Sequence, residues 1–135
     1  MRILGLDLGK KRIGLALGDT HSRIAVGLPT TLNNRHTPDH LRAVITSEQV
    51  KKLIVGLPRT MSGVVGAQAS YTQKWAHELG EALQLPVEFE DERLSSKMAR
   101  DGLIALGEHL SKADIDQAAA VLILQSYLDK LQNGV

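Results

Sequence analysis

The chain has 135 residues, no cysteine, and 16 Lys and Arg against 15 Asp and Glu, which gives a formal net charge of +1. This length suits one domain with its own core, and the lack of cysteine excludes disulfide scaffolds, thiol catalysis and thiolate metal sites. The near-zero charge and the 3% of aromatic residues argue at first against a protein that stacks nucleic-acid bases on aromatic platforms.

The charges are unevenly placed along the chain. Residues 1–77 carry 11 basic and 4 acidic side chains, whereas residues 78–135 carry 5 and 11. Such asymmetry is typical of a polyanion-binding face beside an acidic site, but it also arises by chance, because sequence halves are not faces. An acidic residue, Asp7, follows the N-terminus too closely for a signal peptide, and no apolar run approaches the ~18 residues of a membrane span. We therefore expect a cytoplasmic protein.

The first quarter of the chain predicts three β-strands. Residues 2–8 are rich in Ile and Leu, and residues 12–18 carry apolar side chains at alternate positions, which is the period of a strand. The gap between them contains Gly9 and has the size of a hairpin turn. Residues 24–31 predict the third strand, and Pro29 near its end indicates a sheet edge or the end of the strand.

Helices and strands alternate in the rest of the chain. Thr37 and Pro38 predict the N-cap and first position of a helix, and Ser111 with Asp114 predicts a capping box for the last one. The predicted elements are a helix from 37 to about 50, a buried strand at 52–56, an amphipathic helix at 64–83 with Tyr71 and Trp75 on its core face, a strand at 85–90, and helices at 95–106 and 111–131. This order predicts a single α/β domain over residues 1–135, with a mixed sheet flanked by helices.

Asp7 and Asp116 are two candidate metal ligands. Asp7 lies between leucines in the first strand, where a carboxylate is costly unless it binds metal or has a partner, such as Arg12 across the hairpin. Asp116 lies in the first turns of the last helix, before three alanines that let a helix approach a sheet closely. An Asp there can also simply complement the helix dipole, a role that Asp114 already fills.

A third acidic group follows the strand at 85–90. Asp91 and Glu92 lie past the strand end, where ligands gather in sheets with parallel strands, and Arg93 beside them can offset their repulsion. Glu88 and Glu90 are interpreted as the solvated face of an edge strand. Acids from three separate elements, without cysteine, suit Mg²⁺ or Mn²⁺, and two such ions about 4 Å apart can cleave a phosphodiester.

Basic side chains near these acids are candidate phosphate contacts. Lys10, Lys11 and Arg12 follow a glycine in the predicted turn beside Asp7, and the alternative is a solvated hairpin tip. Arg59 follows the strand at 52–56 and points to the same edge of the sheet.

Four stretches, in order, span nearly the whole chain: GLDLGKKRIGLA at 5–16, VGLP at 55–58, DERLSS at 91–96 and IDQAAAVLILQSYL at 115–128. In these stretches the chain resembles the YqgF family, the RuvX-like nucleases of the RNase H-like superfamily. The resemblance implies a five-stranded mixed sheet flanked by helices. It also implies a cytoplasmic, divalent-metal nuclease for 5′-end maturation of pre-16S rRNA, a family also proposed to resolve Holliday junctions.

The resemblance also implies roles for individual residues. Asp7 matches the first-strand acid and Asp116 the last-helix acid, while Glu92 is our choice for the strand-end acid, with Asp91 as its rival. The chain departs from the family pattern at 95–96, where Ser-Ser replaces the frequent Thr-Thr, and at 107–112, where a loop that is basic in many members is almost uncharged. The second departure weakens the case for a nucleic-acid contact from that loop.

We therefore expect a metal-dependent phosphodiesterase for structured RNA, as a monomer or homodimer, with precursor ribosomes as a further partner. Asp7, Glu92 and Asp116 would hold Mg²⁺ or Mn²⁺, and the phosphate contacts would be Lys10, Lys11, Arg12, Arg59 and Arg93. One alternative keeps the chemistry but acts on branched DNA, and a second is a non-catalytic nucleic-acid-binding module. An actin-like ATPase is a further alternative, but that fold needs two such domains.

Overall fold

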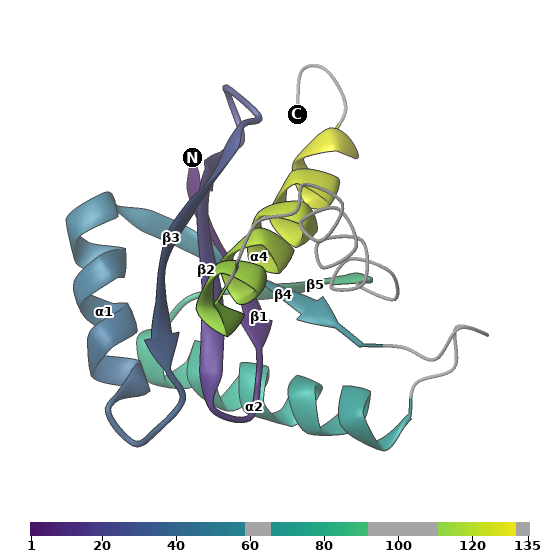
Figure 1. Ribbon diagram of the computed structural model, residues 1–135. Coiled ribbons are helices and arrows are strands. Elements are labelled where there is room, and N and C mark those ends of the chain that lie inside the picture. The colour runs from purple at the N-terminus through teal and green to yellow at the C-terminus, as the bar shows by residue number, and fades with distance from the viewer. Residues whose placement is uncertain (59–65, 92–110, 132–135) are drawn as a thin grey trace.

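A central sheet with helices on both faces forms the protein (Figure 1). The computed structural model describes residues 1–58, 66–91 and 111–131, and it places α4 on one face and α1 and α2 on the other. The elements are β1 (Arg2–Leu8), β2 (Arg12–Asp19), β3 (Ala25–Leu32), α1 (Thr37–Glu48), β4 (Val50–Leu57), α2 (Ala67–Leu83), β5 (Val87–Asp91) and α4 (Lys112–Asp129).

The sheet has five strands in the order β3-β2-β1-β4-β5. The first three strands pair antiparallel through hairpins, while β4 runs parallel to β1 and β5 parallel to β4. Helices α1 and α2 are the crossovers that make these parallel pairings possible. The mixed five-stranded sheet is therefore confirmed. Of the two interpretations of Pro29, the sheet edge is confirmed, while the strand continues past Pro29 to Leu32.

Some predicted boundaries were wrong by a few residues. Helix α1 has His36 as its N-cap, with Thr37 inside the helix, and it ends at Glu48 because Gln49 adopts a left-handed conformation with φ 56°. Nothing in the sequence marks this end, because the usual signal is glycine or asparagine. Helix α2 begins after Gly66, and the helix predicted at 95–106 lies outside the described residues.

The two faces of the sheet are packed differently. On the α1 and α2 face, large aliphatic side chains fill the core, among them Leu4, Leu6, Leu15 and Leu53. On the α4 face, several alternate positions of β1 and β2 are small, among them Gly5, Gly14 and Ala16. A Cβ on Gly5 would lie 2.9 Å from the Cβ of Leu124, so α4 lies almost directly on the strands.

The predicted exposure of two side chains was wrong. Tyr71, predicted to face the core, is 62% exposed, whereas Trp75 packs against the core as expected. Glu90, interpreted as solvated, is only 4% exposed, and it forms an ion pair with Lys130 of the segment after α4. None of the described helices has the length and apolar character needed to cross a membrane.

Candidate active site

Asp7 lies on the face of the sheet that α4 covers. Side chains alternate between faces along a strand, and both Ile3 and Gly5 of β1 meet α4 residues. Asp7 has the same parity, and its directly opposed partner in β2 is Gly14. Its side chain is partly buried, so the sheet presents a carboxylate beneath the first turns of α4.

Gly14 brings Asp116 to the same place. A Cβ built on Gly14 would lie 2.0 Å from the backbone oxygen of Asp116, a distance that no side chain tolerates. Only glycine allows this approach of helix to strand. Since Gly14 is also the partner of Asp7, the structure brings Asp7 and Asp116 together from elements that lie far apart in the sequence. The sequence analysis missed Gly14, and its position in the alternating pattern of β2 was the available signal.

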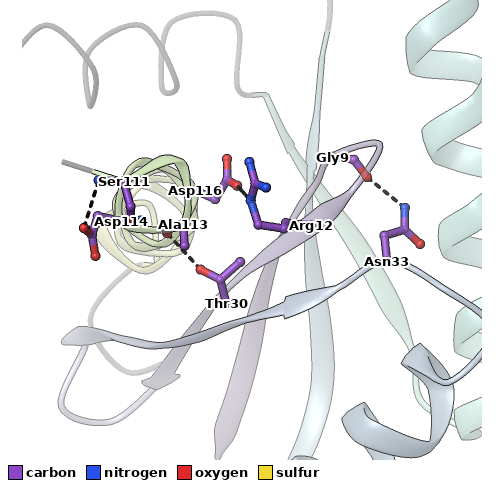
Figure 2. A network of polar contacts seen from close by, with 8 residues as sticks. All are labelled: Gly9, Arg12, Thr30, Asn33, Ser111, Ala113, Asp114 and Asp116. Carbon is purple, nitrogen blue, oxygen red and sulfur yellow. Dashed lines mark hydrogen bonds and ion pairs between the residues drawn. The ribbon is translucent and has the colours of Figure 1, made fainter.

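The N-terminus of α4 is fixed by local and tertiary hydrogen bonds (Figure 2). The Ser111 side chain accepts from the Asp114 backbone and the Asp114 carboxylate accepts from Ser111, which confirms the predicted capping box. From β3, the Thr30 hydroxyl donates to the backbone oxygen of Ala113 at 2.8 Å. These bonds hold the turn that carries Asp116 against the sheet.

Arg12 and Asp116 form an ion pair across the helix–sheet junction (Figure 2). The Nε of Arg12 donates to Oδ2 of Asp116 at 3.1 Å, and the side chains are 28% and 29% exposed. Arg12 therefore pairs with the last-helix acid, a contact that the sequence analysis did not propose. The pair uses Nε, so the terminal nitrogens of the guanidinium can contact an anion from solvent.

The β1–β2 turn places two further cations beside the acids. Lys10 and Lys11 form its exposed tip, closed by a hydrogen bond from the Gly9 backbone nitrogen to the Arg12 oxygen at 2.9 Å. Asn33, after β3, fixes the turn: its side chain donates to the Gly9 oxygen at 2.8 Å (Figure 2) and its backbone donates to Lys11. The tip is thus held in place rather than loosely hinged, a role for Asn33 that the sequence did not reveal.

The remaining predicted site residues are only partly described. Asp91 is the last residue of β5 and pairs with Leu57 of β4. Glu92, Arg93 and Arg59 lie outside the described residues, so their predicted roles remain predictions. Within residues 1–58, 66–91 and 111–131, no group of three metal-ligating side chains is assembled.

A second polar cluster fixes the other half of α4 to the sheet. Lys52 of β4 lies 2.8 Å from Glu88 of β5, and the Tyr127 hydroxyl of α4 also donates to Glu88. Hydrogen bonds from Lys52 and then Tyr127 hold the pKa of the Glu88 carboxyl below its usual value. The hydrogen bond to Glu88 raises the pKa of the Lys52 ammonium, and burial followed by the Glu88 hydrogen bond raises the pKa of Tyr127.

The donor set at Asp7 and Asp116 fits a hard divalent cation. Both groups are carboxylates, they come from a rigid strand and a capped helix, and Gly14 brings the two backbones together. Carboxylate oxygens are the ligands that Mg²⁺ and Mn²⁺ prefer. These two acids supply part of a coordination shell, and the third acid predicted from the sequence would come from residues 91–92.

Comparison with known proteins shows the family of this chain. The model of the family described as "RuvX: Holliday junction resolvase" matches residues 1–130. The chain belongs to the RuvX family. A relative from Acaryochloris marina, named "Putative pre-16S rRNA nuclease", is 48% identical over 94% of this chain and 91% of its own. A second relative with the same name, from Caldanaerobacter subterraneus, is 40% identical over 99% of this chain and 100% of its own.

Solved structures support the same fold for this RuvX member. The RuvC protein of T. thermophilus, in complex with a Holliday junction substrate, is 15% identical with a TM-score of 0.54, and the match covers 95% of this chain and 93% of that one. A fowlpox virus resolvase in complex with Holliday junction DNA is 15% identical with a TM-score of 0.61, and the match covers 98% and 100%. These likenesses confirm an RNase H-like fold. The RuvX family is a nuclease family, so the expectation of an enzyme that acts on nucleic acid is confirmed.

Proposed function

We propose that this RuvX member is a divalent-metal-dependent phosphodiesterase that cleaves structured RNA during 5′-end processing of pre-16S rRNA. The observation that carries the proposal is the meeting of Asp7 and Asp116 over Gly14, beside a basic turn. The name shared by relatives at 40–48% identity supports precursor ribosomal RNA as the substrate.

Asp7, Asp116 and Glu92 would hold Mg²⁺ or Mn²⁺. When bound, the cation supplies the Lewis acidity that phosphodiester hydrolysis needs. The backbone contact at Gly14 sets the spacing between the first two acids before any ligand arrives, and preorganised groups lose least when the substrate binds.

Strand alternation favours Glu92 over Asp91 as the third acid. Along β5, Glu88 and Glu90 contact Tyr127 and Lys130 on the α4 side, whereas Val87 and Phe89 pack against the opposite core. Asp91 shares the parity of the second pair and so projects away from the face that carries Asp7. Asp91 therefore fits the role of the ligand less well, which leaves Glu92 as our choice.

Lys10, Lys11 and Arg12 would position the substrate backbone. The two lysines are exposed at the tip of the turn, where they can neutralise phosphates on either side of the scissile bond. Arg12 can keep its Nε on Asp116 while its terminal nitrogens bind a phosphate, because a guanidinium donates in several directions. Phosphate contacts of this kind orient a substrate without reading its sequence. Arg59 and Arg93 are further candidates for the same role.

Cleavage assays with a matched pair of variants test the proposal. Precursor 16S rRNA and a four-way DNA junction are incubated with Mg²⁺ or Mn²⁺ and wild type, Asp7→Asn or Asp39→Asn, the last being an exposed Asp on α1. We expect the wild type and Asp39→Asn to cut RNA equally and Asp7→Asn to be slower by roughly a hundredfold or more. Equal rates for Asp7→Asn and wild type would overturn the metal-site assignment.

A second candidate function is the resolution of branched DNA. The description of the family model and the two resolvases in complex with Holliday junctions favour it. Symmetric cleavage of a junction requires two active sites related by a two-fold axis, so a stable dimer in solution together with junction cleavage would favour this function. A monomer that cuts only the RNA would exclude it.

A further inference from the structure

A groove lies at the end of β1, on the face of the sheet opposite the candidate active site. It has a volume of about 760 Å³ and is lined by Leu8, Gly9, Lys10, Ala67, Gln68, Tyr71 and Thr72. The first three come from the end of β1 and the turn, and the others come from the first turns of α2. Figure 1 shows this turn beside α2. The volume lies within the ~300–1,000 Å³ of typical ligand sites.

Tyr71 is the aromatic side chain that this groove exposes. The chain has four aromatic residues, and all of them lie in the described ranges. Trp75 and Phe89 pack against the core and Tyr127 donates to Glu88, whereas 62% of Tyr71 is exposed. A ring left open beside a groove offers a flat apolar surface on which a planar ligand can stack.

The exposed side chains of the groove match the parts of one nucleotide. Tyr71 offers a stacking surface for a base, and Gln68, one turn earlier on α2, offers an amide that can bond a base edge. Lys10 offers a cation for the phosphate on the other wall. Stacking on an aromatic ring beside a basic track is the usual way in which proteins bind unpaired nucleotides.

We propose that this groove binds one unpaired nucleotide of the substrate strand, with its base stacked on Tyr71 and its phosphate against Lys10. The proposal rests on the proposed function, because it assigns the occupant from the class of substrate. The site would take RNA or single-stranded DNA, because both present the same base faces and phosphates.

The groove is well placed to act together with the candidate active site. Leu8 lines the groove, and Asp7, its neighbour in β1, faces α4 on the other side of the sheet. A strand that passes around the end of β1 can therefore contact the groove on one side of the sheet and Asp7 on the other. The enzyme would then cut beside the boundary between paired and unpaired nucleotides.

Binding measurements on Tyr71 variants test this site. The probes are a blunt RNA duplex and the same duplex with a single-stranded overhang that carries 2-aminopurine, each also made as DNA, with Ca²⁺ in place of the catalytic ion. We compare wild type with Tyr71→Ala, Tyr71→Phe and Lys51→Ala, the last being an exposed lysine on β4 outside the groove. Since Tyr71 is largely exposed, its replacement should leave the fold intact, and circular dichroism of each variant checks this.

We expect Tyr71→Ala to weaken binding of the overhang probe on the order of tenfold, since stacking on an aromatic ring contributes about that much per base. Its affinity for the blunt duplex should stay unchanged, and it should lose the quenching of 2-aminopurine that the wild type shows. Tyr71→Phe and Lys51→Ala should behave as wild type with the overhang probe. The RNA and DNA versions show which sugar the groove accepts.

Two outcomes separate this proposal from the proposed function. If Tyr71→Ala binds both probes as the wild type does, while Asp7→Asn fails to cut, the groove is not a nucleotide site and the nuclease assignment stands. If Tyr71→Ala loses the overhang selectively but Asp7→Asn cuts normally, the groove binds a nucleotide and the catalytic assignment is wrong.

Discussion

The two faces of the sheet use the same strands for different purposes. On the α1 and α2 face, β1 and β2 present Leu4, Leu6, Ile13 and Leu15, which are fully or almost fully buried in a large aliphatic core. On the α4 face, the alternate positions of the same strands include glycines as well as Ile3, and Arg12 forms its ion pair with Asp116 there. Both faces bury apolar side chains, but on the α4 face the glycines bring the helix backbone close to the strands.

This difference between the two faces indicates where the candidate metal ligands can lie. A carboxylate such as Asp7 has room at the end of this face where Gly14 meets the first turns of α4, whereas Leu124 and Leu128 pack against the other end. A change on the aliphatic face should therefore act on stability, whereas a change under the first turns of α4 should act on geometry. The predictions below test that separation, beginning with the largest effect.

Gly14→Ala should damage the candidate active site most. Its new methyl group would meet the Asp116 backbone oxygen at 2.0 Å, so α4 must shift away from β2. We expect the free energy of unfolding to fall by about 1–3 kcal/mol, and the cleavage rate to fall on the order of a hundredfold because the acids separate. Urea unfolding and RNA cleavage at saturating substrate measure the two effects.

Two variants serve as controls for this prediction. In Gly18→Ala the new methyl would meet side-chain methyl groups of Leu124 and Leu128 at 3.0 Å, which can move, and the Ile24 backbone oxygen at 3.4 Å, which is an ordinary contact distance. Cleavage should therefore be nearly normal. Leu53→Ala on the aliphatic face should cost about 2–5 kcal/mol of stability without changing the rate per folded molecule. If Leu53→Ala slowed cleavage as much as Gly14→Ala, the separation of the two faces would be wrong.

Arg12→Ala should have an intermediate effect, on substrate binding. Because the pair with Asp116 is about a quarter exposed, its loss should cost less than about 1 kcal/mol of stability. RNA affinity should fall, and the slope of log affinity against log salt should decrease by about one, as for one lost phosphate contact. Fluorescence anisotropy at several salt concentrations measures this.

The control for Arg12 is Arg42→Ala, which removes a similar ion pair, with Asp39 on α1. That helix lies against the opposite face of the sheet, so RNA affinity and the salt slope should stay unchanged. An unchanged salt slope for Arg12→Ala as well would show that Arg12 serves only to hold Asp116.

Glu88→Gln should have the smallest effect, a change in how stability depends on pH. Lys52 and Tyr127 lower the pKa of Glu88 in the folded protein. The contribution of Glu88 to the free energy of unfolding is therefore fully present above its ordinary pKa of about 4.3. This contribution is lost as the pH falls through the lower pKa of the folded state. Because the pKa of Lys52 is raised, the contribution of Lys52 to the free energy of unfolding is lost only at strongly alkaline pH. Glu88 is about half exposed, so the effect should stay below about 1 kcal/mol.

Urea unfolding at a series of pH values checks this. The difference in stability between wild type and Glu88→Gln should be largest near neutral pH and shrink towards acid. Glu78→Gln, at an exposed position of α2, is the control. A difference that stays constant between neutral and acidic pH would contradict the role given to Glu88.

The strand order and the cap of α4 could be predicted from the sequence because their signals are local. Alternating apolar residues identify β2, and Ser111 with Asp114 identifies the start of α4. The contacts that complete the site could not be predicted in this way. Arg12 and Asp116 are 104 residues apart, and Glu90 looks like a solvated edge residue until Lys130, 40 residues later, is placed beside it.

Tyr71 illustrates a different limit. Helical spacing puts Tyr71 and Trp75 on neighbouring positions of one helix face, and the pattern therefore predicted both to be buried. Only Trp75 has the sheet beneath it, because Tyr71 borders the groove at the end of β1. A periodic pattern identifies which face of a helix is apolar, but it does not show how far along the helix its partner extends.

The position of Asp116 in α4 also bears on the order in which a newly made chain gains activity. Translation delivers Asp7 and the basic turn first, and more than a hundred residues later it delivers the helix that completes the candidate site. Until α4 has left the ribosome and docked, the unfinished chain carries a basic loop without the second carboxylate. Under the proposed function, cleavage would therefore begin only once α4 has docked and Asp116 has joined Asp7.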